Sequence, residues 1–315
     1  MILAPMQGLT ELLFRRTYEE CFPGAIRLAI SPFLSLTHGI TQRREFSLEA
    51  VRFADVWPAA NRGSIPVVPQ ILGKEPEEFV ALANALADAG YSEVNWNIGC
   101  PMRAITAKHR GSGILPYPDE VRALLEAVMP RMRAKLSVKM RLGLKDKGEI
   151  LALVPVLNDF PLASVAIHPR LGRQQYTGQC DLDAFCQAAD RLRHRVIYNG
   201  DITSAADAQR VHERWPQVAE LMVGRGVLSN PTLPLELAGV SFSEAERHTA
   251  ACRLIRRLME AIGERYGTSE SAVRKAKEYW CLLWHSLPVS EVQARQVLRA
   301  GEWEAVDKMV KEMTQ

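Results

Sequence analysis

Long apolar segments are missing from this chain of 315 residues, which argues against a membrane protein. No apolar run approaches the roughly 18 residues that a membrane-spanning helix needs. The first six residues, Met-Ile-Leu-Ala-Pro-Met, lack the basic region and the long apolar region of a signal peptide. We therefore expect no membrane partner and no signal peptide.

Cysteine is sparse, and its positions form no metal-binding pattern. No two cysteines are spaced as CxxC, so the sequence suggests neither a zinc site nor a disulfide framework. We expect a cytoplasmic protein without a metal site. The six cysteines are Cys21, Cys100, Cys180, Cys186, Cys252 and Cys281.

The common nucleotide-binding signatures are also absent. No GxGxxG follows the first strand-like segment and no Walker sequence occurs, so Rossmann and P-loop nucleotide binding have no support. Charge is nearly balanced, with 39 Lys and Arg against 36 Asp and Glu, a net charge of +3. Such a mildly basic chain permits a nucleic-acid partner without requiring one.

Eight short apolar segments alternate with helical patterns over the first 235 residues. Segments of this kind, rich in β-branched residues and ending in polar residues or Gly, are typical of buried parallel strands. Helical periodicity lies between most of them, at 76–90, 119–132 and 204–215 for example. The predicted strands are 1–6, 29–35, 66–72, 93–99, 136–142, 164–170, 195–201 and 220–226.

This alternation predicts a (β/α)8 TIM barrel, with an open doubly wound sheet as the alternative. Polar residues that could bear chemistry follow nearly all eight strands, as on the active-site rim of a barrel. An open sheet would gather them at one switch point instead. Residues 242–315 have no strand signal and show four helical segments, 250–266, 269–284, 290–300 and 302–313. We therefore predict a catalytic barrel domain, 1–240, and a C-terminal all-α helical bundle domain, 241–315.

The segment Asn97-Ile98-Gly99-Cys100-Pro101 follows the fourth predicted strand. A basic, Gly-rich stretch, 102–113, comes directly after it, and together they suggest a mobile loop presenting the thiol of Cys100 as an acid or nucleophile. The alternative is a structural cysteine in a surface loop, which local sequence leaves open.

Two pairs of basic residues lie near the ends of successive strands. Lys139 and Arg141 are two residues apart and share one face of a strand, and His168 and Arg170 repeat this spacing on the next strand. Buried cations need anionic or electron-rich partners, and at a barrel mouth they could hold a flavin ring or a nucleobase. The alternative is that these residues lie at strand ends with their charged groups in solvent.

Glycine-containing turns follow the last two predicted strands. These are Asn199-Gly200-Asp201 and Gly224-Arg225-Gly226. The loops after strands seven and eight of a barrel are its usual phosphate site, because Gly lets backbone N–H groups approach and Arg225 adds charge. The plain alternative is two tight turns.

Taken together and in order, nine short motifs resemble the bacterial tRNA-dihydrouridine synthases. The resemblance covers the whole predicted barrel, and the C-terminal helical segment agrees in size and placement. The motifs are Ala4-Pro5-Met6-Gln7-Gly8, Pro69-Gln70-Ile71-Leu72-Gly73, Asn97-Ile98-Gly99-Cys100-Pro101, Arg110-Gly111-Ser112-Gly113-Ile114-Leu115, Val138-Lys139-Met140-Arg141-Leu142-Gly143, His168-Pro169-Arg170, Tyr176-Thr177-Gly178, Asn199-Gly200-Asp201 and Gly224-Arg225-Gly226.

The resemblance implies an FMN-dependent barrel that reduces specific uridines in tRNA, with NADPH or NADH as the reductant. It implies that Cys100 is the proton donor and that Asn97 and Arg141 contact the target uridine and nearby RNA. The FMN-binding positions it implies are Pro5, Met6, Gln7, Gln70, Lys139, His168, Asn199, Gly200, Asp201, Gly224 and Arg225.

A uridine in folded tRNA must leave its stack to enter the pocket, so basic side chains are expected to hold the RNA. Candidates are Arg103, beside the predicted thiol loop, and Lys277, in the helical segment. For each of them, an ordinary solvated surface position is the alternative. We expect a monomer that binds tRNA.

Several positions depart from the pattern that the resemblance sets. Pro169 stands where Gly is expected, Asn95 where Asp is more usual, and Arg103 where Lys is more frequent. These departures bear on which tRNA position is reduced. Two other functions stay open: a flavin barrel acting on a small pyrimidine, and a non-catalytic RNA-binding protein.

Overall fold

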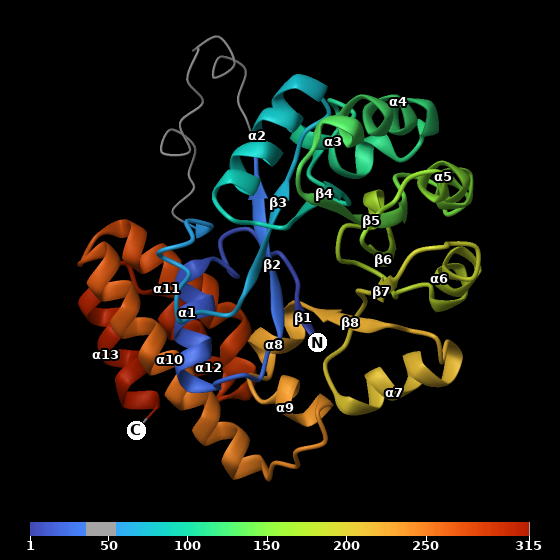
Figure 1. Cartoon of the computed structure of the whole chain (residues 1–315). Helices are drawn as coiled ribbons and strands as arrows, with labels where there is room; N and C mark the ends of the chain where they lie inside the picture. Colours follow the sequence, from blue (N-terminus) through green and yellow to red (C-terminus); the bar gives the residue numbers. More distant parts are fainter. Residues whose placement is uncertain (36–54, 315) are drawn as a thin grey trace.

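All eight apolar segments predicted as strands contribute a strand to one closed parallel barrel, which confirms the (β/α)8 prediction (Figure 1). The computed structural model describes residues 1–35 and 55–314. Each strand pairs with the next in sequence, and β8 closes the barrel on β1. The strands are β1 (Ile2–Leu3), β2 (Leu28–Leu34), β3 (Val67–Ile71), β4 (Glu93–Ile98), β5 (Lys135–Gly143), β6 (Val165–Leu171), β7 (Val196–Tyr198) and β8 (Glu220–Val223).

Three strands end three residues before their predicted carboxyl ends. The segments 1–6, 195–201 and 220–226 keep only two to four residues in the sheet, as β1, β7 and β8. Pro5 has no N–H to donate to the sheet. The Gly-containing ends of the other two turn away over the barrel mouth instead of pairing.

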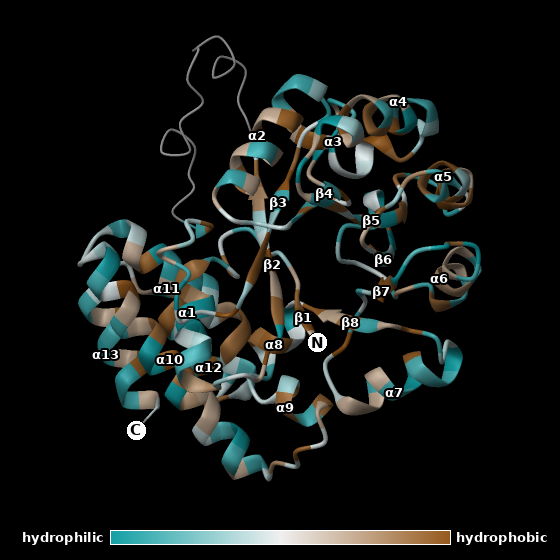
Figure 2. Ribbon diagram, in the orientation of Figure 1, coloured by the Kyte–Doolittle hydropathy of each residue, from teal (hydrophilic) through white to brown (hydrophobic). Residues whose placement is uncertain are grey.

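Helices surround the barrel on its outer side, with polar residues facing outward (Figure 2). They are α1 (Leu12–Cys21), α2 (Pro76–Asp88), α4 (Pro118–Val128), α5 (Glu149–Asn158), α6 (Leu182–Ala189) and α7 (Ala205–Arg214). Shorter turns of helix lie in the loops: α3 (Arg103–Thr106), η2 (Gly111–Ile114), η3 (Met129–Arg131), η4 (Gly172–Gln174), α8 (Arg225–Ser229) and α9 (Leu233–Leu237).

Local sequence explains where two predicted helices begin or end. Ser204 caps α7: its Oγ accepts from the N–H of Asp207, at 3.2 Å, and the Asp207 carboxylate accepts from the N–H of Ser204, at 2.9 Å. The helix predicted over 119–132 instead ends at Val128 and continues as the 3₁₀ turn η3. Pro130, which lacks an N–H, cannot continue the α-helical hydrogen bonding there.

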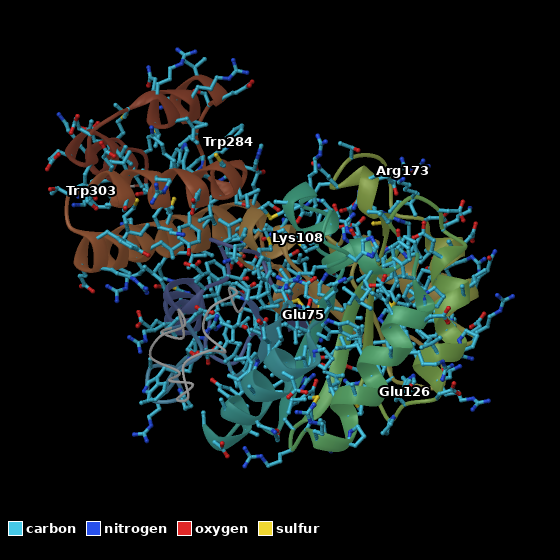
Figure 3. All side chains as sticks on the ribbon, turned by 90° about the horizontal axis from the view of Figure 1, so that it is seen from above. Glu75, Lys108, Glu126, Arg173, Trp284 and Trp303 are labelled. Carbon is cyan, nitrogen blue, oxygen red and sulfur yellow. The ribbon has the colours of Figure 1, made fainter. Side chains whose placement is uncertain are left out.

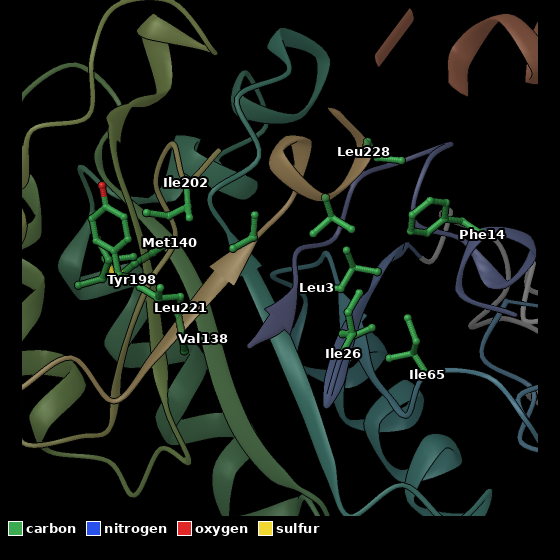
Figure 4. Packing of buried hydrophobic residues seen from close by; sticks show 14 of the residues in the cluster. Leu3, Phe14, Ile26, Ile65, Val138, Met140, Tyr198, Ile202, Leu221 and Leu228 are labelled. Carbon is green, nitrogen blue, oxygen red and sulfur yellow. The ribbon is translucent and has the colours of Figure 1, made fainter. Parts of the chain in front are cut away.

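Strand side chains alternate between two cores. Those facing outward pack against the helices, among them Leu3, Val138, Met140, Tyr198 and Leu221 (Figure 4). Those facing inward form a separate small cluster inside the barrel. Its members are Ile2, Ala4, Ile30, Val68, Ala166, Ile197 and Met222. Because Val138 and Met140 face outward, Lys139 and Arg141 face the barrel interior, as their spacing predicted.

Four helices follow the barrel and pack beside α1 on one side of it (Figure 1). They are α10 (Glu244–Tyr266), α11 (Glu270–Leu283), α12 (Glu291–Arg299) and α13 (Trp303–Met313), with η5 (Trp284–Ser286) after α11. The predicted all-α C-terminal region is confirmed, whereas the boundary at residue 240 stays a prediction. Helix α10 begins six residues before the predicted position, because Ser243 and Glu246 form a capping box.

The tryptophans divide between core and interface. Trp96 is buried, faces away from Asn97 because neighbouring strand residues alternate sides, and packs edge-on against Phe79 of α2. Trp280 is buried in the helical bundle, but Trp284 is only partly buried. Trp284 lies on the side of the helical domain nearest the barrel, and Trp303 lies farther away (Figure 3).

None of the helices in residues 1–35 and 55–314 combines the length and the hydrophobicity that crossing a bilayer requires. The same residues contain no group of three or more His, Cys, Asp or Glu side chains placed to bind a metal ion.

Candidate active site

The carboxyl ends of the strands enclose a cavity of about 900 Å³. Every residue predicted to bind FMN lines it, and so do Cys100, Asn97 and Arg141. Polar residues that are far apart in the sequence come together here because all eight strands run in the same direction and end at the same rim. The predicted residues lining the cavity are Pro5, Met6, Gln7, Gln70, Asn97, Cys100, Lys139, Arg141, His168, Asn199, Gly200, Asp201, Gly224 and Arg225.

Two of the predicted RNA contacts do not line this cavity. Arg103 is exposed on α3. Lys277 lies on α11 in a separate shallow depression beside Arg274 and Cys281. The structure therefore does not bring these two side chains to the barrel mouth, and their contact with RNA stays a prediction.

A chain of buried amides fixes the turn that carries Cys100. The side-chain oxygen of Asn97 accepts from the backbone N–H groups of Gly99 and Cys100, at 3.0 and 2.9 Å. Its Nδ2 donates to Gln70 Oε1, and Gln70 Nε2 donates to Asn95 Oδ1, both at 2.8 Å. Each of these two donor nitrogens keeps a second hydrogen that a ligand can use.

The segment after Cys100 folds into the two short helices α3 and η2, which close back on the cysteine. The N–H and Oγ of Ser112 both donate to the carbonyl oxygen of Cys100, at 2.9 and 3.1 Å. Gly111 has a φ of +56°, and a Cβ there would lie 2.6 Å from that oxygen. Only glycine fits this position without displacing Cys100.

The Cys100 side chain is suited to hold a proton. Burial raises the pKa of the thiol above its usual value, although a hydrogen bond from the backbone of Met102 and the charges of Arg141 and Lys139 oppose the rise. The group is therefore a thiol at neutral pH, as an acid requires.

Lys139 lies at the base of the cavity without a protein partner. Within the described residues, no hydrogen bond or ion pair engages its ammonium group. Burial, with a smaller contribution from the Arg141 charge, lowers its pKa to about 7. A buried ammonium of this kind favours an anionic or electron-rich ligand.

Arg141 ties two strand ends together while facing the same cavity. Its Nε donates to the carbonyl of Gly99, at 3.0 Å, and its Nη1 donates to the carbonyl of Leu171, at 2.8 Å. Burial lowers the pKa of Arg141 to about 10, so the guanidinium stays charged at neutral pH. Its Nη2 is left to a ligand.

Asp201 is shared by two arginines. Its Oδ1 accepts from Arg170 Nη1 at 3.0 Å and from Arg225 Nη2 at 2.8 Å, and its Oδ2 accepts from Arg170 Nη2. Burial alone would raise the pKa of Asp201, but hydrogen bonding and charge from the arginines lower it overall. The carboxylate thus orients Arg225 at the cavity wall.

Three features of the cavity lie outside the predicted FMN and RNA contacts. Arg170, of the second basic pair, lines the cavity, and so does Tyr176. The Tyr176 side chain is 57% exposed, and the guanidinium carbons of Arg141 and Arg225 lie 5.6 and 5.1 Å from its ring centre. Leu282 and His285 of the helical domain also line the cavity, and no local signal in the sequence points to them.

Comparison with known proteins identifies the family. Residues 2–314 match the profile of the family described as Dihydrouridine synthase. The chain is 29% identical to the probable tRNA-dihydrouridine synthase of Rhodobacter capsulatus over 247 residues, covering 78% of this chain and 73% of that protein. It is 26% identical to the tRNA-dihydrouridine(16) synthase of Ralstonia nicotianae over 241 residues, with coverages of 76% and 72%.

Solved structures share the barrel fold. The old yellow enzyme homologue from Zymomonas mobilis aligns with a TM-score of 0.52 at 12% identity, covering 77% of this chain and 89% of that one. Histamine dehydrogenase from Rhizobium sp. 4-9 aligns with a TM-score of 0.58 at 11% identity, covering 100% and 62%. At such identities the likeness concerns the fold alone. By its match over nearly the whole sequence, the chain belongs to the dihydrouridine synthase family.

Proposed function

We propose that this protein is an FMN-dependent tRNA-dihydrouridine synthase, which reduces specific uridines in tRNA to 5,6-dihydrouridine with NADPH as the reductant. The observation that carries the proposal is one cavity in which a protonated thiol, Cys100, faces the same space as Lys139, Arg141 and His168. Family membership gives this arrangement its reaction class.

The residues present fit a flavin mononucleotide. The unpartnered ammonium of Lys139 suits the electron-rich edge of an isoalloxazine ring, and Gln70 keeps one amide hydrogen for it. Arg225, beside Gly224 at the end of β8, supplies the positive charge that a phosphate needs. When bound and reduced, this group would supply the hydride that carbon 6 of the uracil ring accepts.

Cys100 completes the reduction by giving its proton to carbon 5 of the uracil. One new C–H bond forms at each of the two carbons, the C5–C6 double bond becomes a single bond, and the sulfur is left as a thiolate. The cations of Lys139 and Arg141 stabilise that thiolate until solvent returns a proton.

The target base needs hydrogen-bond donors for its carbonyl oxygens. Arg141 Nη2 and the free Nδ2 hydrogen of Asn97 both lie at the cavity wall. Charge from Arg141 polarises a uracil carbonyl and favours the electron density that builds up there during hydride addition. Tyr176, with two arginines on its ring, offers a flat face at the rim for the extruded nucleotide.

One polypeptide supplies every side chain that this reaction uses, so we propose that the enzyme works as a monomer. We also propose that it acts in the cytoplasm, on tRNA. Arg103 and Lys277 lie outside the cavity and would act only on the body of the tRNA.

The decisive experiment is single turnover. The protein is loaded with FMN, reduced without oxygen, and mixed with tRNA transcribed in vitro, which contains only unmodified uridine. We expect the flavin absorbance near 450 nm to return and mass spectrometry to find dihydrouridine. Reoxidation by free uracil but not by tRNA would favour a small-molecule reductase, and a protein that binds no FMN would overturn the proposal.

A further inference from the structure

Arg170, at the end of β6, makes more contacts than an ordinary ion pair requires. Its side chain is 2% exposed. Nε donates to the carbonyl of Thr177 at 3.2 Å and Nη2 donates to that of Gly178 at 2.6 Å, while both terminal nitrogens bind Asp201. The guanidinium is therefore fixed in position and orientation.

The same guanidinium contacts His168, which lies two residues earlier on the same strand and lines the cavity. Arg170 Nη1 and His168 Nε2 are 3.1 Å apart. Arginine has five hydrogens to donate and no acceptor. A hydrogen bond between these two atoms makes the imidazole Nε2 the acceptor, which puts the proton of the neutral ring on Nδ1.

The surroundings of His168 keep the ring neutral. Lys139 and Arg141 face it from β5, Arg170 from β6 and Arg225 from α8. The carboxylate that Arg170 binds, Asp201, is already shared by two arginines. Burial and these four positive charges hold the pKa of His168 well below its usual value, so a second ring proton is disfavoured.

We propose that Arg170 is a positioning residue that holds His168 as the Nδ1–H tautomer, making this histidine a hydrogen-bond donor toward the bound cofactor. On the cavity wall formed by β5, β6 and α8, the side chains of Lys139, Arg141, His168 and Arg225 then all present hydrogen-bond donors. Such a wall selects an acceptor-rich or anionic group, such as a pyrimidinedione edge or a phosphate. This deepens the proposed function, since the acceptor belongs to FMN.

The tautomer can be measured directly in the wild-type protein by NMR, with ¹⁵N-labelled histidine, in the presence and absence of FMN. The chain has seven histidines, and the His168→Gln variant identifies the relevant signal. We expect a pyrrole-type Nδ1 and a pyridine-type Nε2, unchanged down to about pH 6, where an ordinary histidine is largely charged. A protonated Nε2 in the wild-type protein would overturn the proposal.

The variant Arg170→Met removes the donor while keeping a long side chain. We expect the His168 proton to move to Nε2 and the dissociation constant for FMN to rise about tenfold, the effect of one hydrogen bond. Arg170→Lys restores a single donor and should restore the Nδ1–H tautomer. Arg173→Met, on the exposed turn η4, is the matched control and should change neither value.

The possible outcomes distinguish a failure of the role inferred for Arg170 from a failure of the proposed FMN-dependent function. If Arg170→Met keeps the Nδ1–H tautomer, Arg170 does not set it and the inference is wrong. If that variant fails to fold by circular dichroism, the wild-type spectrum still decides. If the wild-type protein binds no FMN, the proposed function fails, while the tautomer in the cofactor-free protein is judged separately.

Discussion

Ser112 donates both its backbone N–H and its hydroxyl to the carbonyl oxygen of Cys100, at 2.9 and 3.1 Å. Cys100 is thus held by a turn twelve residues farther along the chain. The side-chain oxygen of Asn97 also accepts from the backbone N–H groups of Gly99 and Cys100. The backbone of Cys100 is therefore held at both its N–H and its carbonyl. These hydrogen bonds fix the backbone from which the Cys100 side chain extends.

The first prediction concerns the acid itself. In Cys100→Ala, we expect FMN to bind as in the wild-type protein and tRNA reduction to fall by about 10² to 10⁴-fold, the usual contribution of a positioned acid. Single-turnover rates with tRNA and titration with FMN measure the two effects. Cys281→Ala, at an exposed cysteine of the helical domain, is the control. A Cys100→Ala enzyme with the wild-type rate would show that another group supplies the proton.

The second prediction tests the turn behind Cys100. In Gly111→Ala, the new methyl group meets the carbonyl oxygen of Cys100, so we expect tRNA reduction to slow and the free energy of unfolding to fall by roughly 1–3 kcal/mol. Gly24→Ala is the matched control, because Gly24 also has a positive φ, +71°, but has no atom within 4 Å of the new methyl.

Urea denaturation and single-turnover rates separate the two variants. The control should lose stability through backbone strain, by about 1 kcal/mol, and keep its activity. Equal activity in both variants would mean that the contact with Cys100 is without consequence.

The third prediction is a pH dependence of stability. The pKa of Lys139 falls from 10.5 in the unfolded chain to about 7 in the fold, so the unfolded state binds more protons between these values. Lys139 therefore destabilises the cofactor-free protein fully below about pH 7, and less as the pH rises toward 10. Lys139→Met should raise the free energy of unfolding by a few kcal/mol at pH 6.5 and by much less near pH 10.

Urea denaturation of the two proteins at both pH values measures this difference. Lys135→Met, at the exposed start of the same strand, is the control and should show no such pH dependence. A stabilisation by Lys139→Met that is equal at both pH values would contradict a buried ammonium.

The fourth prediction separates phosphate from ring recognition. Arg225 lies where a phosphate is expected, and a charge-assisted hydrogen bond contributes about 1.5–3 kcal/mol. Arg225→Met should therefore weaken FMN binding by roughly tenfold or more and leave riboflavin binding nearly unchanged. Quenching of flavin fluorescence gives both dissociation constants. Equal losses for the two flavins would place the phosphate elsewhere.

The fifth prediction concerns the helical domain. His285 is exposed, lies with its ring tilted against that of Trp284 and the ring centres 3.9 Å apart, and lines the cavity that contains Cys100. The short helix η5 thus forms part of the cavity edge, where an aromatic ring can stack on a base of an entering RNA. His285→Ala should raise KM for tRNA roughly fivefold or more and leave flavin reduction by NADPH unchanged.

Steady-state assays with tRNA and with NADPH measure the two constants. His248→Ala on α10 is the control, because this histidine does not line the cavity. An unchanged KM for tRNA in His285→Ala would show that His285 does not contribute to tRNA binding at the cavity edge.

Much of the fold and most of the candidate site could be predicted, because the responsible signals are local. Lys139 and Arg141 are two residues apart on a strand whose intervening residues are apolar, so strand periodicity alone points both toward the interior. The parallel arrangement then gathers the residues that end each strand at one rim, which is why the FMN-binding residues implied by the resemblance all line one cavity. Arg103 and Lys277 had only their charge to suggest a role, and neither lines it.

The amino-acid sequence by itself determined the strand and helix pattern, the inward-facing basic pairs and the glycine turns, since these depend on neighbours a few residues away. Only the tertiary structure decided the partners: Arg170 with Asp201 across 31 residues, Ser112 with Cys100, and His285 of the helical domain beside the barrel cavity. A hydrogen bond requires a particular distance and direction between two groups. For residues far apart in the sequence, these are set only when the barrel closes and the helices pack against it.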